Sequence, residues 1–206
     1  MNPDTALFLT INDLARATGW LQPAVVAYAK YGVLLFAALL LGGWWLARRR
    51  ASVPAMAAAL WAPAGMLLAL GINQPVAALV GEPRPDVLYP HILVLAQHGA
   101  DPSFPSDHAV MAGSVTAGLF LVSRRLGAAA ALAAVLMAVA RVYVGAHFPQ
   151  DVLAGLLLGA AVALGGFRLA SGVLTRLVVA LQAGPVRPLL TNAPHSRSAA
   201  APRAAS

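Results

Sequence analysis

The chain has 206 residues, of which 60% are hydrophobic and only 10% are charged. This composition, with several apolar runs of nearly twenty residues, excludes an ordinary water-soluble protein and indicates a helical membrane protein. The absence of cysteine excludes disulfides, thiolate metal sites and a cysteine nucleophile. The length suits one helical bundle and leaves no room for a second folded domain.

The first predicted element is an amphipathic helix over residues 4–20. Leu7, Phe8 and Ile11 fall on one side of this helix, whereas Asn12 and Asp13 fall on the other. Such a pattern is typical of a helix that lies in the membrane interface. An ordinary helix of the bundle is the alternative.

Five apolar stretches follow, and we predict a transmembrane helix in each, at residues 25–47, 53–72, 109–122, 128–144 and 152–170. The third and fifth are short for a hydrocarbon core of about 30 Å, which is tolerable if their ends lie inside the bundle. Small residues at helical spacing, such as Gly155 and Gly159, indicate close helix packing.

The predicted fold is therefore all-α. It is an integral membrane bundle of about five transmembrane helices with an N-terminal interfacial helix, all within residues 1–182. From residue 183 onward Pro, Ala, Ser and Arg recur without periodicity, which predicts a disordered basic cytoplasmic tail over residues 183–206.

Charge predicts the orientation of the bundle. If the run Arg48-Arg49-Arg50 is cytoplasmic, alternate loops place ten of the 14 basic residues on that side, and all seven acids fall on the other. We therefore expect a multi-pass protein of the cell (inner) membrane, with its polar motifs on the extracytoplasmic face. The basic excess then reflects topology and contact with anionic membrane lipids, and nucleic acid is not an expected partner.

The first polar motif is Pro105-Ser106-Asp107-His108, directly before an apolar helix. Ser106 suits the N-cap, where its hydroxyl and the first free amides of the helix can hold a phosphate. His108 can protonate a leaving oxygen, because histidine titrates near neutral pH. A capped helix with an incidental histidine is the structural alternative.

Two arginines accompany this motif. Arg84 lies in a proline-rich outer loop, where an isolated arginine is normally solvated. Arg141 lies near the outer end of an apolar helix, where a charge is costly, by about 2.5–3.5 kcal/mol at mid-membrane. Its planar guanidinium suits phosphate oxygens, although an ion pair with Asp151 or Asp107 would serve structure equally well.

The second motif joins His147 and Asp151, with Pro149 suited to the first turn of the last helix. We expect the carboxylate to accept a hydrogen bond from one ring nitrogen of His147, which leaves the other nitrogen free as a nucleophile. Alternatively, Asp151 only favours a helix N-terminus and His147 is an interfacial residue.

Together, the Arg-Pro pair, the Pro-Ser-x-His motif and the Arg, His and Asp of the second motif resemble the type-2 phosphatidic acid phosphatase superfamily of integral membrane lipid phosphatases. The resemblance covers about residues 73–155. It implies that His147 attacks phosphorus to form a phosphohistidine, that Asp151 orients it and that His108 protonates the leaving group.

The same resemblance implies that Arg84, Ser106 and Arg141 hold the phosphate oxygens, and that no metal or other cofactor is needed. A metal-dependent hydrolase built on His108, His147 and Asp151 is an alternative drawn from the residues alone.

The chain departs from the family pattern at three positions. Ala77 stands where the family usually has a lysine, and Glu82 where a second basic residue is common. Lys30, in the outer third of the first span, is a costly residue that can supply the missing phosphate contact. Asp107 replaces the usual glycine, and we include it and Lys30 among the phosphate-binding residues.

In three features the chain resembles the bacterial undecaprenyl-diphosphate phosphatase branch: aspartate at position 107, the sequence SFPSDH and the five-span layout. The expected function is removal of the terminal phosphate of a polyprenyl diphosphate, which recycles the lipid carrier of cell-wall synthesis. Phosphatidic acid and phosphatidylglycerol phosphate are alternative substrates. A catalytically degenerate lipid-binding protein, favoured only by Ala77, is an alternative of another class. His91 and His98 receive no role.

Overall fold

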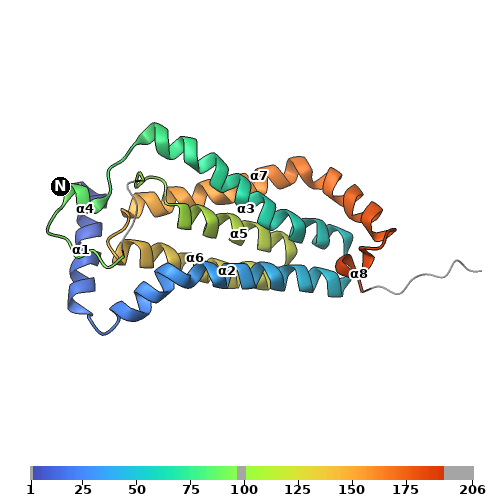
Figure 1. Cartoon of the computed structure of the whole chain (residues 1–206), viewed down its shortest axis with the longest axis horizontal. Coiled ribbons are helices and arrows are strands. Elements are labelled where there is room, and N and C mark those ends of the chain that lie inside the picture. Colours follow the sequence, from blue (N-terminus) through green and yellow to red (C-terminus); the bar gives the residue numbers. More distant parts are fainter. Residues whose placement is uncertain (1, 97–100, 193–206) are drawn as a thin grey trace, which may run out of the picture.

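The computed structural model describes residues 2–96 and 101–192, and every regular element in this part is a helix (Figure 1). The predicted all-α fold is confirmed. The elements are α1 (Pro3–Ala17), α2 (Gln22–Arg50), α3 (Val53–Val80), α4 (Pro85–Leu88), α5 (Asp107–Val122), α6 (Arg124–Tyr143), α7 (Pro149–Gln182) and α8 (Arg187–Leu190).

Four of the described helices, α2, α3, α6 and α7, are long and apolar enough to cross a membrane. The third predicted span, α5, has 16 residues and is buried along most of its length. It packs against α2, α3, α6 and α7, so the short helix lies inside the bundle, as its length predicted. The chain is therefore a multi-pass membrane protein.

Two helices extend beyond the predicted spans. α3 continues past Ile72 to Val80 and ends at Gly81, whose φ of 62° provides a left-handed C-cap. α7 continues past Ala170 to Gln182, and Val178 in this extension packs fully buried against Ala47 and Met56. The hydropathy of a sequence predicts where a helix leaves the hydrocarbon core of the membrane. Here both helices continue beyond that point.

Helix α1 crosses one end of the bundle and does not run along it (Figure 1). Leu7 and Leu14 are exposed and suit contact with lipid, whereas Phe8 and Ala15 are buried. Asn12, expected on the polar side, is also buried, because its amide pairs with both backbone groups of Leu93 at 2.8 and 2.9 Å. The interfacial helix is thereby fixed to the loop that carries the polar motifs.

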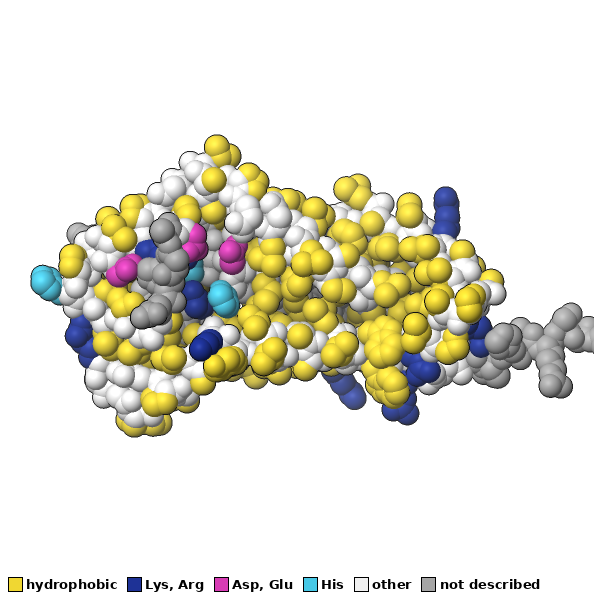
Figure 2. Space-filling view, in the orientation of Figure 1, with side chains coloured by type: hydrophobic (Ala, Val, Ile, Leu, Met, Phe, Trp, Pro, Cys, Tyr) yellow, Lys and Arg dark blue, Asp and Glu magenta, His cyan; other side chains and the backbone are white. Residues whose placement is uncertain are grey.

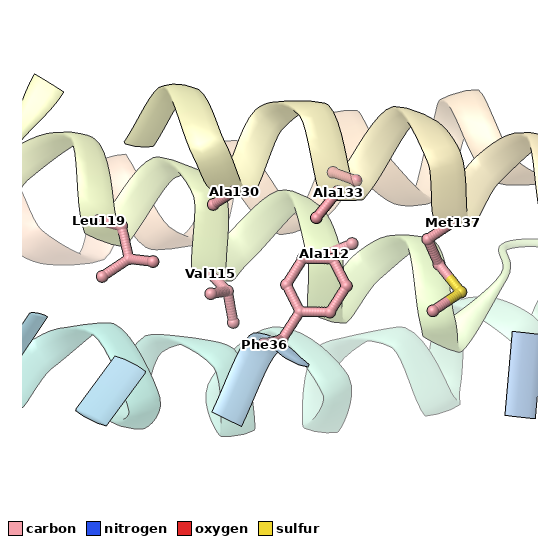
Figure 3. Close-up of a cluster of buried hydrophobic side chains, with 8 residues drawn as sticks. Phe36, Ala112, Val115, Leu119, Ala130, Ala133 and Met137 are labelled. Atoms are coloured by element: carbon pink, nitrogen blue, oxygen red, sulfur yellow. The ribbon is translucent and has the colours of Figure 1, made fainter. Parts of the chain in front are cut away.

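The contact between α5 and α7 is made by small residues, as predicted. A Cβ atom on Gly113 would lie 2.2 Å from the carbonyl oxygen of Leu156, and one on Gly159 would lie 2.0 Å from that of Val110. Only glycine allows this approach of two backbones. On another side of α5, a core cluster joins it to α2 and α6 through Phe36, Val115 and Met137 (Figure 3). The position of the start of α5 is thus determined by contacts on several sides.

Within the predicted tail, α8 returns to the bundle. The Trp44 indole donates to Leu189 O at 2.9 Å, the Arg48 guanidinium donates to Pro188 O, and Leu190 is buried. Residues 193–206 and His98 lie outside the described residues.

The two ends of the bundle carry different charges. The described acids belong to α1, to the segment between α3 and α5, and to the first turns of α5 and α7, all at one end. In Figure 2 the acidic side chains gather at that end, and arginines predominate at the other.

Candidate active site

A cavity of about 810 Å³ lies at the acidic end, between α2, α3, α5, α6 and the loops above them. Six predicted site residues from five separate segments line it: Lys30, Arg84, Asp107, His108, Arg141 and His147. Figure 2 shows basic, acidic and histidine side chains around this part of the surface. Ser106 and Asp151 lie in the layer directly beneath it, and both are fully buried.

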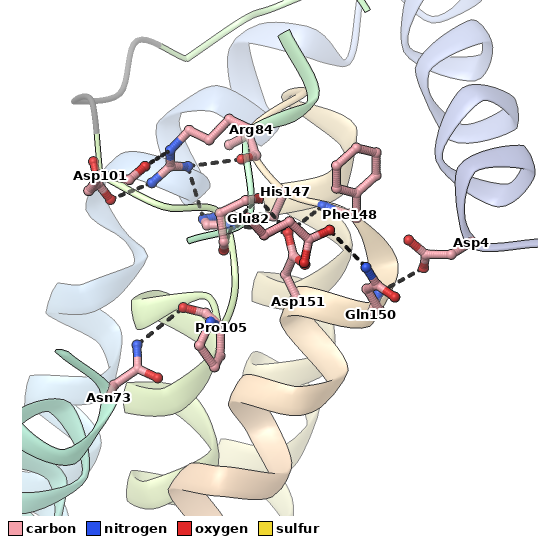
Figure 4. A network of polar contacts seen from close by, with 12 residues as sticks. Asp4, Asn73, Glu82, Arg84, Asp101, Pro105, His147, Phe148, Gln150 and Asp151 are labelled. Atoms are coloured by element: carbon pink, nitrogen blue, oxygen red, sulfur yellow. Dashed lines mark hydrogen bonds and ion pairs between the residues drawn. The ribbon is translucent and has the colours of Figure 1, made fainter. Parts of the chain in front are cut away.

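The orientation of His147 is determined by the backbone of the segment before α5 (Figure 4). Its Nδ1 lies 2.8 Å from Ser103 O. A carbonyl oxygen only accepts, so Nδ1 carries the proton and Nε2 carries the lone pair. Arg84 Nη1 lies 3.4 Å from Nε2, on the side of the ring from which a nucleophile would act.

Asp151 acts on His147 through Ser103. Its Oδ2 accepts hydrogen bonds from Ser103 Oγ at 2.5 Å and from the Phe148 amide at 2.8 Å, but it is 3.6 Å from His147 Nδ1. The expected direct hydrogen bond between the two side chains is therefore replaced, because the Ser103 carbonyl lies closer to Nδ1. The buried carboxylate holds the segment that holds the imidazole.

Burial keeps His147 neutral. Loss of solvent, followed by the charges of Arg141 and Arg84, holds the pKa of His147 well below its ordinary value of 6.5. The carbonyl of Ser103 and the charge of Asp101 oppose this effect but do not reverse it. At neutral pH the ring is an uncharged base with its Nε2 lone pair available.

Arg84 is buried, contrary to the expectation for an arginine in a proline-rich loop. Its Nε donates to Asp101 O at 3.0 Å, its Nη1 donates to Ala146 O at 2.9 Å, and its Nη2 pairs with the Asp101 carboxylate. Burial raises the pKa of Asp101, but the hydrogen bond from Arg84 and its charge outweigh this and lower the pKa overall. The guanidinium is thus held beside His147 by a partner 17 residues away along the chain.

Arg141 and Ser106 lack the partners that buried polar groups normally have. Arg141 is only 8% exposed, yet its guanidinium makes no hydrogen bond or ion pair with any described residue, including Asp107 and Asp151, and its Nε is buried without a partner. The Ser106 hydroxyl is buried at the N-cap of α5 and also has no partner among them. A buried cation without a protein anion is expensive, so these groups suit an anionic ligand.

The remaining predicted residues surround these groups. His108 is half-buried in the first turn of α5. Asp107 Oδ1 accepts from the side-chain amides of Asn73 at 2.7 Å and Gln74 at 3.2 Å. Lys30 lines the same cavity as Ala77, the position at which the family lysine is missing. The described residues contain no group of three or more His, Asp and Glu side chains placed to hold a metal ion.

Sequence reasoning missed Ser103, Asp101 and Asn73. Ser103 is the first residue of the SFPSDH segment, two residues before the first motif, so its proximity to the motif was a usable signal. Asn73 interrupts an apolar stretch and is fully buried, where it donates to Pro105 O at 3.1 Å. No sequence signal connects Asp101 to Arg84.

The chain is similar to known phosphatases along most of its length. The model of the PAP2 superfamily matches residues 58–173. The bacitracin transport permease protein BcrC of Bacillus licheniformis is 31% identical over 157 residues, which cover 76% of this chain and 75% of that protein. The undecaprenyl-diphosphatase BcrC of Bacillus subtilis (strain 168) is 28% identical over 152 residues, with 74% and 76% covered.

Two solved structures share the fold. A PAP2-type phosphatidylglycerolphosphate phosphatase of Bacillus subtilis matches with a TM-score of 0.59 and 25% identity, over 82% of this chain and 88% of the other. Aquifex aeolicus LpxE matches with a TM-score of 0.55 and 21% identity, over 80% and 94%, and supports the fold alone. The chain belongs to the PAP2 superfamily and is a membrane lipid phosphatase, a hydrolase of phosphate esters or anhydrides.

Proposed function

We propose that the protein removes the terminal phosphate of a polyprenyl diphosphate, such as undecaprenyl diphosphate, and so recycles the lipid carrier of cell-wall synthesis. The observation that carries the proposal is Arg141, a buried cation without a protein partner that lines the same cavity as His108 and His147. The relative named an undecaprenyl-diphosphatase, which matches over three quarters of its length, favours this substrate.

In the first step, Nε2 of His147 attacks the terminal phosphorus in line with the bridging oxygen. The N–P bond forms as the P–O bond to the bridging oxygen breaks, and His108 donates a proton to that oxygen, which leaves as the polyprenyl monophosphate. The carbonyl of Ser103 stabilises the positive charge that develops on the ring, because it accepts from Nδ1.

In the second step, water attacks the phosphohistidine. His108, now neutral, takes the proton from the water, the N–P bond breaks, and inorganic phosphate leaves. In both steps Arg84, Arg141, the Ser106 hydroxyl and the first amides of α5 stabilise the charge on the equatorial oxygens. The substrate phosphate would thus be the partner that the Arg141 guanidinium and the Ser106 hydroxyl lack within the protein.

The lipid tail would remain in the bilayer while the head group enters the cavity. The cavity lies between α2 and α3, whose outer faces carry exposed apolar side chains such as Leu34 and Leu79. Anchoring by the tail restricts the head group to the depth of the site, so hydrophobic positioning supplements the polar contacts.

Substrate choice is tested with the purified protein in mixed micelles, by measuring phosphate release from undecaprenyl diphosphate, phosphatidic acid and phosphatidylglycerol phosphate at equal surface fractions. The highest kcat/KM is expected for the polyprenyl diphosphate. A preference for phosphatidylglycerol phosphate would favour the second candidate, which the 25% identical structural neighbour supports.

The intermediate is tested by quenching turnover of a terminally ³²P-labelled substrate in base, in which phosphohistidine survives. Label is expected on the wild-type chain, in the peptide that contains His147. The same label on a His147→Ala chain would overturn the nucleophile assignment.

The extracytoplasmic placement of the site rests on the distribution of basic residues. Because the chain has no cysteine, single cysteines can be introduced at two exposed positions, Val87 near the catalytic end and Leu189 at the other. In intact cells a membrane-impermeant maleimide should label Val87→Cys and spare Leu189→Cys. The reverse result would place the site in the cytoplasm.

A further inference from the structure

A second cavity lies at the opposite end of the bundle from the catalytic residues. It has a volume of about 590 Å³ and lies where α2 ends and the chain passes from α5 to α6. Its lining consists of Arg50, Phe120, Val122, Ser123, Arg124 and Arg125.

Three arginines line this cavity, and no carboxylate lies among its lining residues. Arg50 Nη1 donates to Val122 O at 3.3 Å, while Arg124 and Arg125 form no ion pair with any described residue. The acids of the chain lie in segments at the other end. The cavity therefore has a local positive potential that an anion would neutralise.

The start of α6 adds uncharged donors to the same cavity. Ser123 is the N-cap residue of this 20-residue helix, but its hydroxyl does not cap the helix and makes no hydrogen bond with any described residue. Ser123 is only 8% exposed, and it lines the cavity. A hydroxyl without a protein partner thus lies beside the first free amides of α6, an arrangement that binds phosphate groups.

The depth of this cavity indicates where such a phosphate comes from. It lies at the ends of membrane-spanning helices, which is the level of lipid head groups. Phe120 and Leu121, just before Ser123 on α5, are 45% and 37% exposed and offer an apolar surface to acyl chains. An apolar surface directly below a group of arginines matches the two parts of a phospholipid.

We propose that this cavity binds the head group of an anionic glycerophospholipid. Arg50, Arg124 and Arg125 pair with the phosphodiester, the Ser123 hydroxyl donates to it, and one acyl chain lies along Phe120. The site is separate from the catalytic cavity, so the proposal does not depend on the substrate.

The test is native mass spectrometry of the full chain in detergent, with phosphatidylglycerol and phosphatidylcholine of identical acyl chains. The test variant combines Arg50→Gln, Arg124→Gln and Arg125→Gln. The control variant combines Arg49→Gln, Arg168→Gln and Arg176→Gln, which removes equal charge from the same end at exposed positions outside the cavity.

The wild type and the control variant should bind the first phosphatidylglycerol more tightly than phosphatidylcholine. The cavity variant should bind phosphatidylglycerol about a hundredfold more weakly, because three arginine contacts to the anionic head group are lost together. Equal losses in both variants, or none in either, would overturn the proposal. Displacement of the lipid by an equal concentration of inorganic phosphate would also overturn it, in favour of a free-anion site.

Thermal unfolding in detergent separates binding from folding. Both variants should unfold at the wild-type temperature, because the three cavity arginines are exposed and make few protein contacts. If the cavity variant unfolds early and Ser123→Ala, which removes only the hydroxyl, leaves phosphatidylglycerol binding unchanged, the proposal fails.

Discussion

The two ends of the bundle use arginine in different ways. At the catalytic end, Arg84 is buried and held by Asp101 and by the carbonyl of Ala146, so its guanidinium has one position. At the other end, Arg124 and Arg125 are exposed and form no ion pair with described residues. A guanidinium held by protein partners suits a reaction that needs defined geometry, whereas exposed guanidinium groups without such partners suit the lipid contact proposed above.

Replacement of His147, the proposed nucleophile, should have the largest effect on activity. His147→Ala is expected to lower phosphate release about 10⁴-fold or more, because the covalent step is lost. His91→Ala is the control, since His91 lies at the same end but is exposed, and only its backbone oxygen contacts another element. Equal activity of the two variants would show that the catalytic end does not work through His147.

The next largest effect is expected when Ser103 loses its hydroxyl. Ser103→Ala keeps the carbonyl that orients His147 but removes the hydrogen bond to Asp151, so kcat should fall about 10- to 100-fold with little change in KM. Ser103→Thr keeps a hydroxyl and should recover most of kcat. A rise in KM with an unchanged kcat would contradict this positioning role.

Lys30 should affect binding more than chemistry. Lys30→Met is expected to raise KM about tenfold, because one phosphate contact is lost, and Lys30→Arg should preserve KM. Ala77→Lys in the Lys30→Met background should restore KM, since both positions line the same cavity. Unchanged phosphate release by Lys30→Met would show that the charge plays no part.

The pH dependence reports the burial of His147. Its pKa is lowered, so the neutral ring persists below pH 6.5 and is lost only as the pH falls through the lowered value. The acid limb of kcat/KM should therefore lie below pH 6.5. Asp101→Asn should move this limb further toward acid, because the charge of Asp101 raises the pKa of His147. A limb that stays in place would show that the titration of His147 does not set it.

The smallest effect is expected from the basic end. The variant with Arg50→Gln, Arg124→Gln and Arg125→Gln should change phosphate release in detergent less than about twofold, because exposed charges far from the reacting atoms contribute little. A large loss of turnover at constant thermal stability would mean that the two ends are coupled.

The sequence predicted the helical bundle and the gathering of the motif residues, because apolar periodicity places helices and the motifs lie at helix ends. It did not predict that Arg84 is buried. Its partner Asp101 lies 17 residues further along the chain, and only the folded conformation of the loop brings the two side chains together. The hydrogen bond from His147 to the Ser103 carbonyl was also missed, because a backbone atom has no sequence signature. α3 and α7 exceeded their predicted ends, because α3 continues to its C-cap at Gly81 and because Val178 packs the last part of α7 against the bundle.

The glycine contact between α5 and α7 has a consequence for how such an enzyme can change. His108 lies in the first turn of α5 and His147 precedes α7, so the spacing of the proposed proton donor and nucleophile depends on two backbones in direct contact and tolerates little variation. Lys30 and Ala77 lie on α2 and α3, across the cavity from this contact. Substitutions there can alter the choice of head group without moving the reacting atoms, so new lipid specificities can evolve on one side of the site while the chemistry on the other is conserved.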